Sequence, residues 1–590
     1  MLMDRKEIMM IDLRTAGKAG IEYKAQLERK EIQVGNITRY VWLYIGKVFV
    51  VANPVVFVYA PAGENIQEFA EKTGWLKEAD RNGNVLVFPE PEEEWDISEE
   101  KDLQFWDAIK NISDIRFKSH NTRQYICGYQ DGAAMVEKVV LHSPEFFGGI
   151  SLINPPEVGR DVLEAAGQEI STEYIRYNDV MKDYPVILSK DVEQNILLIT
   201  EYEGQLTETI AFWKSVGNGK NPYAGVIVCA PEGWDAQKVY SDFFSRTRRY
   251  RIAPNGELRE ASDYRDNPNA KRYYEKLGTD VEREWIEVLP SDYDAAVKIP
   301  LVIALHGSNN DGAQFYDITR LWEISEARKC IVLFPTALRS EKAYEAWNFY
   351  SHTPKDNGND DESFLLALIR KYQTEYSGDP SRTYLTGFSN GGGMVNWMTM
   401  NHPELFAAVM PYSGAHKTPE YYTPFDENSI LVPYWMNRGE FEYKPSTLSM
   451  VVAGKEQWEY WKKRNGLAAE PDLTIENTRT RTEIYSGRVE TRYTKRKLAH
   501  HAILSEQYWD IYDNFFIRFC RGEHGESIED GYTHIAKLSG RNVLLRRSKR
   551  IDGHIYICAK EAETALKHPV PECEVTGKCM IDGEAYYQIS

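Results

Sequence analysis

The segment RTYLTGFSNGGGMV at residues 382–395 decides the fold of the second half of this chain. Residues 383–386 suit a buried strand and residues 394–400 suit a helix, so the segment predicts a strand that turns sharply into a helix. Ser389 lies at that turn, and the flanking glycines permit the close backbone approach that it needs. A serine held there exposes its hydroxyl, which is typical of a catalytic nucleophile. The plainer alternative is a serine that caps a glycine-rich helix start.

The same segment has a counterpart in the first half of the chain. RQYICGYQDGAAMVEKVVLHSPEFFGGISLIN at residues 123–154 aligns without a gap with RTYLTGFSNGGGMVNWMTMNHPELFAAVMPYS at residues 382–413. NPVVFVYAPAGEN from Asn53 matches IPLVIALHGSNND from Ile299, and the segments beginning WDAQ and WDIY match near the end of each copy. The pairs occur in the same order, so two copies of one fold explain them.

The polar, turn-rich stretch ASDYRDNPNAKR separates the two copies. We expect a first domain at residues 1–262, a second at residues 263–522 and a C-terminal extension at residues 523–590. Within each copy, short apolar runs alternate with amphipathic segments, which predicts a mainly parallel sheet with helices on both faces. The fold class is therefore α/β, with two such sandwiches in tandem. Alternating segments such as HIYICAK and EAYYQIS predict a β-rich extension.

Composition excludes several classes of partner. The formal net charge is −19 and the predicted pI is near 5.3, which argues against a nucleic-acid surface. No apolar run has transmembrane length, and the first twenty residues lack the apolar core of a signal peptide. Seven cysteines, an odd number, fit reduced thiols. We expect a cytoplasmic protein, or a secreted one if a signal was trimmed, without a cofactor, metal site or membrane partner.

A serine nucleophile needs a histidine to accept its proton, and a carboxylate to orient that histidine. In sheets of this kind the chain order is serine, acid, histidine. Of the histidines after Ser389, His402 belongs to the next helix, and His416 follows the next strand too closely. His500 and His501 precede a predicted helix at residues 505–519, where the catalytic histidine is expected. We favour His501, with His500 as the alternate.

The acid should follow a late strand, and the apolar run at residues 430–436 precedes the loop NRGEFEY. Glu442 is the favoured acid and Glu440 the alternate, although most surface glutamates are merely solvated.

Backbone N–H groups should stabilise the oxyanion of the intermediate. The expected donors are Asn390, directly after the nucleophile, and Ser308, in the loop that follows the apolar run at residues 301–305. His306, in the same loop, precedes the nucleophile and is expected to be structural. Trp347 is a candidate wall of the substrate pocket, although an aromatic residue in that setting is as often part of the core.

At these residues the second copy resembles the polyhydroxybutyrate depolymerase family of α/β-hydrolases, which is related to feruloyl and acetyl-xylan esterases. The matching segments are VLPSDYDAAVKIPLVIALHGSNNDG, DPSRTYLTGFSNGGGMV, HPELFAAVMPYSG and the His-Ala pair that begins at His501. They span roughly residues 287–521. The family usually carries Gly-x-x-Asp at the acid, whereas this chain has Gly439 and Glu442 at that spacing.

The resemblance implies two α/β-hydrolase folds in tandem, with hydrolysis of a carboxylic ester through an acyl-enzyme on Ser389. It implies an ester substrate such as a plant-polysaccharide ester or a hydroxyalkanoate, and it does not predict the oligomeric state. A serine peptidase of related fold is one alternative, and a non-catalytic binding or scaffold protein is another. An amide substrate panel separates the first alternative from an esterase, and substitution of Ser389 tests the second.

The first copy lacks the residues on which this chemistry depends. Gln130 stands where Ser389 would be, Ala60 and Pro61 replace the His-Gly pair, and no histidine occurs between His142 and His306. We therefore expect residues 1–262 to form a pseudo-hydrolase domain. It would pack against the catalytic copy, shape its cleft, or bind a glycan or polymer.

Overall fold

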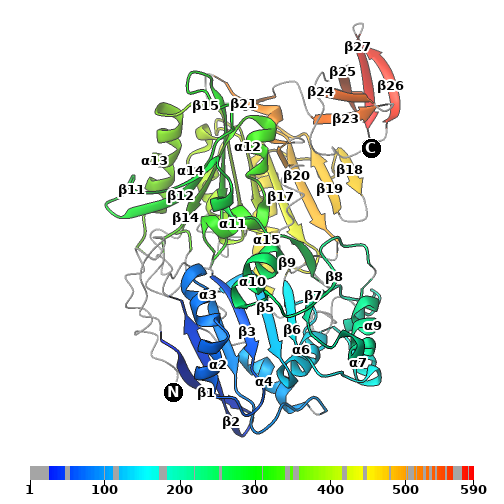
Figure 1. Ribbon diagram of the computed structural model, residues 1–590. Helices are drawn as coiled ribbons and strands as arrows, with labels where there is room; N and C mark the ends of the chain where they lie inside the picture. The colour runs from blue at the N-terminus through cyan, green and yellow to red at the C-terminus, as the bar shows by residue number, and fades with distance from the viewer. Residues whose placement is uncertain are drawn as a thin grey trace. The chain divides into compact units, whose positions relative to one another are not determined.

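A computed structural model describes most of the 590 residues, in two compact units, Met1–Ser262 (unit 1) and Asp263–Ser590 (unit 2). Figure 1 shows the helices and strands of both units. The described residues are 26–46, 53–98, 100–110, 119–171, 182–217, 219–250, 256–308, 310–338, 346–349, 358–414, 422–442, 448–476, 480–497, 499, 501, 511–512, 515–522, 527–529, 534–538, 541–551, 554–561, 575–581 and 584–589.

Unit 1 is built on a sheet whose central strands are parallel. In order across the sheet, the strands are β1 (Glu28–Val34), β2 (Ile37–Ile45), β4 (Val85–Pro89), β3 (Asn53–Tyr59), β5 (Ser119–Tyr129), β6 (Gly149–Ile153), β7 (Asn195–Ile199) and β8 (Gly225–Cys229). The pairs β1–β2 and β2–β4 are antiparallel, and all pairs from β4 to β8 are parallel. A two-stranded sheet follows, made of β9 (Thr247–Tyr250) and β10 (Glu257–Glu260).

Both faces of the unit 1 sheet are buried. Along β3, Val55 and Phe57 pack in one apolar cluster, while Val56 and Val58 pack in another. Since successive side chains of a strand point to opposite faces, helices must cover both sides. Its main helices are α2 (Ile66–Lys72), α3 (Trp75–Asn82), α4 (Lys101–Ile109), α6 (Asp131–His142), α7 (Arg160–Gly167) and α9 (Thr207–Ser215).

Unit 2 repeats this arrangement with a longer sheet. The strand order is β11 (Ala270–Lys276), β12 (Glu282–Val288), β14 (Ile331–Thr336), β13 (Ile299–Leu305), β15 (Gly378–Phe388), β16 (Ala408–Tyr412), β17 (Tyr434–Gly439), β20 (Thr491–Arg496), β19 (Thr480–Tyr485) and β18 (Leu473–Glu476). The run from β14 to β20 is parallel, and both edges are antiparallel. The predicted tandem α/β fold, with mainly parallel sheets, is confirmed.

The helices of unit 2 include two with aspartate caps at their first turns. The α-helices in the described part of unit 2 are α11 (Gly312–Thr319), α12 (Glu323–Arg328), α13 (Asp361–Thr374), α14 (Asn390–Asn401) and α15 (Leu448–Arg464). Asp311 accepts the Gln314 N–H at the start of α11, and Asp360 accepts the Ser363 N–H at the start of α13. Such caps satisfy backbone donors that a helix end leaves unpaired.

Two predicted elements differ from the structure. The run at residues 430–436 was expected to be one strand, but β17 begins only at Tyr434, because Pro433 has no N–H to donate to a neighbouring strand. The helix predicted at residues 505–519 does not reach its expected end. Phe516–Arg518 forms a 3₁₀ turn, and Phe519–Arg521 is strand β21, which pairs with β22 (Ser527–Glu529).

The C-terminal residues form a separate antiparallel sheet of β structure, as expected. Its strands, orange to red in Figure 1, are ordered β23 (His534–Leu538), β24 (Arg541–Ile551), β25 (His554–Glu561), β27 (Glu584–Ile589) and β26 (Val575–Ile581). The sheet falls within unit 2, so a separate domain at residues 523–590 stays a prediction.

Each unit contains the same internal contacts at corresponding positions, in addition to the corresponding strand order. In unit 1 the Tyr125 ring stacks on Phe244, and its hydroxyl donates to the Thr247 carbonyl at 2.8 Å. In unit 2 the Tyr384 ring stacks on Phe516, and its hydroxyl donates to the Phe519 carbonyl at 2.8 Å. The same ring stacking and the same hydrogen bond therefore fix the tyrosine of β5 in unit 1 and that of β15 in unit 2.

Candidate active site

Ser389 occupies a strained turn between β15 and α14. Its φ of +54° is unusual for a residue with a side chain, and its N–H donates to the Tyr412 carbonyl at 2.8 Å. A Cβ on Gly391 would lie 2.4 Å from the carbonyl oxygens of Leu305 and His306. The turn therefore requires glycine there, because a larger residue would force the helix away from β13.

Three side chains from distant parts of the sequence meet at this turn. His501 places Nε2 2.8 Å from Ser389 Oγ and Nδ1 2.9 Å from Glu442 Oε1. The His501 ring also packs against Phe388, with ring centroids 4.8 Å apart. The three side chains thus form one hydrogen-bonded chain in which an imidazole lies between a hydroxyl and a carboxylate, the arrangement that proton transfer from a serine requires.

The backbone fixes the loop that carries Glu442 beside the segment that carries His501. The N–H of Glu440 donates to the Arg496 carbonyl, and the N–H of Phe441 donates to the Ala499 carbonyl, each at 2.9 Å. These bonds continue the parallel pairing of β17 with β20 beyond the end of β17. The sheet therefore brings the loop of Glu442 to the segment that leads to His501.

Glu442 is deeply buried and anionic. Its side chain is 3% exposed, and Arg438 Nε donates to its Oε2 at 2.6 Å. Burial by itself raises the pKa of this carboxyl, but the Arg438 guanidinium and the contact with His501 lower it to about 2. The alternate acid, Glu440, instead pairs with Lys495 at 3.5 Å. The alternate histidine, His500, lies outside the described residues.

His306 supports the loop next to Ser389 as a neutral histidine. It is fully buried, its Nδ1 lies 2.7 Å from the Gly307 carbonyl, and its Nε2 accepts the Ala337 N–H at 2.9 Å. Nε2 can accept only when it carries no proton, so the proton is on Nδ1. Burial lowers the pKa of His306 to about 4.

This neutral histidine predicts a pH dependence of stability. Because the ordinary pKa is 6.5, the unfolded chain binds a proton between pH 6.5 and 4 that the folded unit does not. The contribution of neutral His306 to the free energy of unfolding is therefore complete above pH 6.5. It falls by roughly 3 kcal/mol as the pH drops to 4. Urea unfolding at pH 7 and pH 4.5 should show a smaller difference in His306→Asn than in the wild type. Equal differences would contradict this role.

Gly307 allows its loop to pass close to Ser389. A Cβ on Gly307 would lie 3.3 Å from Ser389 Cβ, so the loop passes directly beside the serine. Ser308 follows in this loop and is half-buried, with its carbonyl accepting from Asn310 Nδ2 at 3.2 Å. The structure thus brings the loop of Ser308 to Ser389.

Trp347 is not the pocket wall proposed as one alternative from the sequence. It is fully buried, and its indole N–H donates to the His306 carbonyl at 2.9 Å. The Asn390 side chain holds the Trp347 backbone, since Asn390 Oδ1 accepts the Trp347 N–H at 2.6 Å and Nδ2 donates to the Trp347 carbonyl at 3.2 Å. Trp347 therefore connects the turn of Ser389 to the His306 loop as part of the core.

A buried ion pair that sequence reasoning missed supports this tryptophan. Arg283 of β12 pairs with Asp361 of α13, and both side chains are fully buried. The second oxygen of Asp361 accepts the N–H of Asn348, the residue after Trp347, at 2.7 Å. The pair therefore anchors the segment that holds the His306 loop.

Unit 1 contains the same support at corresponding positions. Arg39 pairs with Asp102 at 2.7 Å, and Asp102 Oδ2 accepts the Asp96 N–H at 2.8 Å. The indole N–H of Trp95 donates to the Ala60 carbonyl at 2.8 Å. Aligning the two copies around these tryptophans would have revealed the Arg, Asp and Trp positions from the sequence alone.

The turn of unit 1 differs from that of unit 2 in what surrounds it. Gln130 retains the strained φ of +50°, without a hydroxyl. Asp131, which corresponds to Asn390, accepts the N–H of Ala62 through Oδ2 at 3.1 Å. Ala62 corresponds to Ser308 in the repeat. The N–H group at this loop position in unit 1 is therefore occupied by a carboxylate of the same unit.

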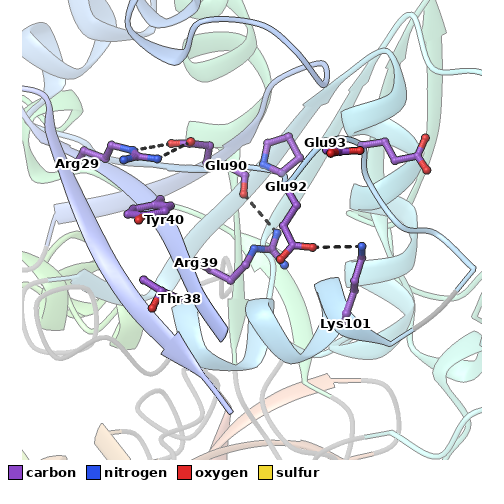
Figure 2. Close-up of a pocket in the computed structure, with 10 residues that line it drawn as sticks. Arg29, Thr38, Arg39, Tyr40, Glu90, Glu92, Glu93 and Lys101 are labelled. Atoms are coloured by element: carbon purple, nitrogen blue, oxygen red, sulfur yellow. Dashed lines mark hydrogen bonds and ion pairs between the residues drawn. The ribbon is translucent and has the colours of Figure 1, made fainter. Parts of the chain in front are cut away.

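A charged pocket also lies on unit 1, and Figure 2 shows the residues that line it. Its cations are ion-paired, Arg29 with Glu90 at 2.7 Å and Lys101 with Glu92 at 3.3 Å, while Arg39 forms the buried pair described above. This pocket contains none of the site residues expected from the sequence. The candidate active site is instead the group of side chains that meet at Ser389.

Comparison with known proteins agrees with the resemblance seen in the motifs. The family described as "Esterase PHB depolymerase" matches residues 287–420, a region that includes Ser308, Ser389 and Asn390 but not Glu442 or His501. The predicted resemblance is thus confirmed for the second half of the chain.

The similar curated proteins are esterases. A probable acetylxylan esterase A of Aspergillus flavus is 25% identical over 162 residues, which is 27% of this chain and 47% of the relative. Feruloyl esterase B of Thermothelomyces thermophilus is 26% identical over 157 residues, 27% of this chain and 48% of the relative. The chain spans about half the length of the curated relatives that it matches.

A solved acetyl xylan esterase from Aspergillus awamori is 18% identical to this chain, with a TM-score of 0.33. The match covers 41% of this chain and 98% of the solved chain.

Among the described residues, no helix has the length and apolar character that crossing a membrane requires.

Proposed function

We propose that unit 2 hydrolyses carboxylic esters through an acyl-enzyme formed on Ser389. The observation that carries this proposal is the position of His501, 2.8 Å from the Ser389 hydroxyl and 2.9 Å from the Glu442 carboxylate. A serine hydroxyl is a poor nucleophile until a neighbouring base accepts its proton, and this geometry supplies that base.

In the first half of the proposed reaction, Ser389 Oγ attacks the ester carbonyl carbon as its proton passes to His501 Nε2. The Glu442 carboxylate holds the Nδ1 proton and stabilises the imidazolium that forms. The N–H groups of Asn390 and Ser308 are the proposed donors to the oxyanion. The imidazolium then protonates the departing alcohol as the carbon–oxygen ester bond breaks.

In the second half, His501 removes a proton from water, which attacks the acyl-enzyme carbonyl. The second oxyanion collapses to release the carboxylic acid, and the proton returns from His501 to Ser389 Oγ. Because the proton only shuttles between serine, histidine, alcohol and water, this mechanism needs no cofactor.

The proposed substrate is an ester of a plant polysaccharide or of a hydroxyalkanoate, in line with the names of the matching family and relatives. The test is a parallel assay of the full chain with an aryl acetate, methyl ferulate, acetylated xylan and polyhydroxybutyrate. A matched amide is included to detect a peptidase. Faster cleavage of esters than of the amide supports the proposal, whereas preferential cleavage of the amide would contradict it.

We propose that unit 1 is a copy of the same fold without hydrolytic activity. Gln130 replaces the nucleophile, and the Asp131 carboxylate occupies the Ala62 N–H that corresponds to a proposed oxyanion donor. Even a suitably placed ester would therefore meet no nucleophile there, and one of the two corresponding donors is already occupied. Its proposed contribution is structural.

The difference between the two units predicts the effect of Asn390→Asp. An aspartate lacks the Nδ2 donor that binds the Trp347 carbonyl, so its carboxylate should turn to accept the Ser308 N–H, as Asp131 accepts the Ala62 N–H, and repel the developing oxyanion. We expect kcat to fall by about 10²–10³-fold, the usual effect of losing one oxyanion donor. Asn401→Asp, at the other end of α14, is the matched control and should retain activity. Retained activity in Asn390→Asp would contradict the proposed role of this donor.

A further inference from the structure

The Glu442 carboxylate divides its two oxygens between two partners. Oε1 faces His501 Nδ1 at 2.9 Å, and Oε2 accepts from Arg438 Nε at 2.6 Å. Arg438 lies near the end of β17 and is 9% exposed, so both members of the ion pair are shielded from water. The carboxylate is therefore fixed from both sides.

Helix α15 leaves space for the Arg438 side chain at Gly454. A Cβ on Gly454 of that helix would lie 1.3 Å from Arg438 Nη1 and 2.3 Å from its Cζ. The guanidinium thus lies directly against the helix at a position where any side chain would displace it. Strand β17 supplies the charge, and α15 supplies the space for it.

Among the described residues, three buried tyrosines are the other titratable groups on which the Arg438 charge acts. Tyr422, Tyr434 and Tyr493 are close enough for its charge to lower the pKa values of their phenols, but burial outweighs this effect and raises all three above the ordinary value. Lys495 pairs with Glu440 instead. In the described part of the site, the charges that act on the Glu442 carboxylate are therefore those of Arg438 and, when protonated, His501.

We infer that Arg438 is a positioning residue of the triad, which holds Glu442 in its anionic form and aims its free oxygen at His501; this inference rests on the proposed function. A buried carboxylate without a cationic partner takes up a proton far more readily than a solvated one. A protonated Glu442 would orient His501 poorly, because it would no longer offer an anionic acceptor to Nδ1. Arg438 thereby extends the activity of the triad toward acidic pH.

The test measures the reactivity of Ser389 without assuming the natural ester. A fluorophosphonate probe reacts as Ser389 Oγ bonds to phosphorus, fluoride leaves and the hydroxyl proton passes to His501. The rate of labelling is followed from pH 5 to 9 in the full chain for the wild type, Arg438→Met and Arg438→Lys. Arg492→Met is the matched control for the loss of a buried arginine, because Arg492 is as buried as Arg438, at 9% exposure, and pairs with Glu490 rather than with Glu442.

We expect Arg438→Met to move the acid limb of the labelling profile upward by about one pH unit or more, which slows labelling at acidic pH roughly tenfold. Arg438→Lys, which retains the charge, should stay close to the wild type, and Arg492→Met should keep the wild-type profile. Gly454→Ala should act in the same direction as Arg438→Met, because it displaces the guanidinium.

The outcomes separate the two proposals. If the wild type is labelled at Ser389, but Arg438→Met and Arg492→Met have the same pH profile of labelling, the role of Arg438 is overturned. The proposed function is then unaffected. Absence of labelling at Ser389 in the folded wild type overturns both. If Arg438→Met fails to fold, a wild-type profile in soluble Gly454→Ala overturns the inference, and a shifted one supports it.

Discussion

Replacement of Ser389 by alanine is expected to reduce ester hydrolysis by about 10⁴-fold or more, as removal of the nucleophile does in serine hydrolases. The physical reason is that His501 would retain its position and its acid partner but would have no hydroxyl to activate. The expected loss is in kcat, measured on the fastest ester of the panel. Thermal unfolding should be nearly unchanged, because the substitution removes only one oxygen.

Ser381→Ala is the matched control for this prediction. Ser381 lies in the same strand, β15, and its hydroxyl donates to Asp379 rather than to a group of the site. Activity in this variant should equal that of the wild type. Ester hydrolysis retained by Ser389→Ala would contradict the assignment of the nucleophile, and residual activity traced to residues 1–262 would contradict the proposed silence of unit 1.

Replacement of Glu442 by glutamine is expected to lower kcat by about 10³–10⁴-fold with little change in KM. A glutamine amide can present an N–H to His501 Nδ1, which favours the tautomer that carries its proton on Nε2 and cannot accept the serine proton. The substitution also leaves the buried Arg438 guanidinium without its anion, so a moderate loss of stability should accompany the loss of activity. Steady-state kinetics together with urea unfolding would separate the two effects.

Glu440→Gln tests the assignment of the acid at the alternate residue. Glu440 is the alternate acid and pairs with Lys495, with its side chain 19% exposed. Its substitution should change kcat by less than about twofold, since a partly exposed ion pair contributes little. A larger loss in Glu440→Gln than in Glu442→Gln would show that the acid has been assigned to the wrong residue.

The strained turn that carries Ser389 could be predicted from the sequence because its requirements are local. Gly387, Ser389 and Gly391 lie within five consecutive residues, and the strand before them and the helix after them have distinct apolar patterns. The tandem α/β architecture was predictable for a related reason, since each fully buried parallel strand appears as a short apolar run.

The acid was harder to predict because its assignment depends on where a strand ends. A serine–acid–histidine order leaves two glutamates in the loop after β17, and sequence patterns do not show which one faces the histidine. The backbone bonds from Glu440 to Arg496 and from Phe441 to Ala499 decide this, because they orient Glu442 toward His501 and direct Glu440 toward Lys495. Such pairing between distant segments leaves no periodic signal in the sequence.

The buried supports of the site could not be predicted from any single motif. Arg438 resembles a surface arginine in the sequence, and only the structure, through its contact with Gly454 and its pair with buried Glu442, shows that it is enclosed. Trp347 seemed suited to a pocket because aromatic residues are common there, yet its indole N–H is used within the core. In both cases, tertiary contacts determine a role that residue type leaves open.

The most direct test of the central claim is to trap the acyl-enzyme. The full chain is mixed with an aryl ester of a slowly hydrolysed acid, quenched within the first turnover and analysed by peptide mass spectrometry. We predict a single acyl adduct on Ser389 in the wild type, and none at that position in Ser389→Ala. An adduct on a different residue, or turnover of the ester without any adduct on Ser389, would contradict the proposed mechanism.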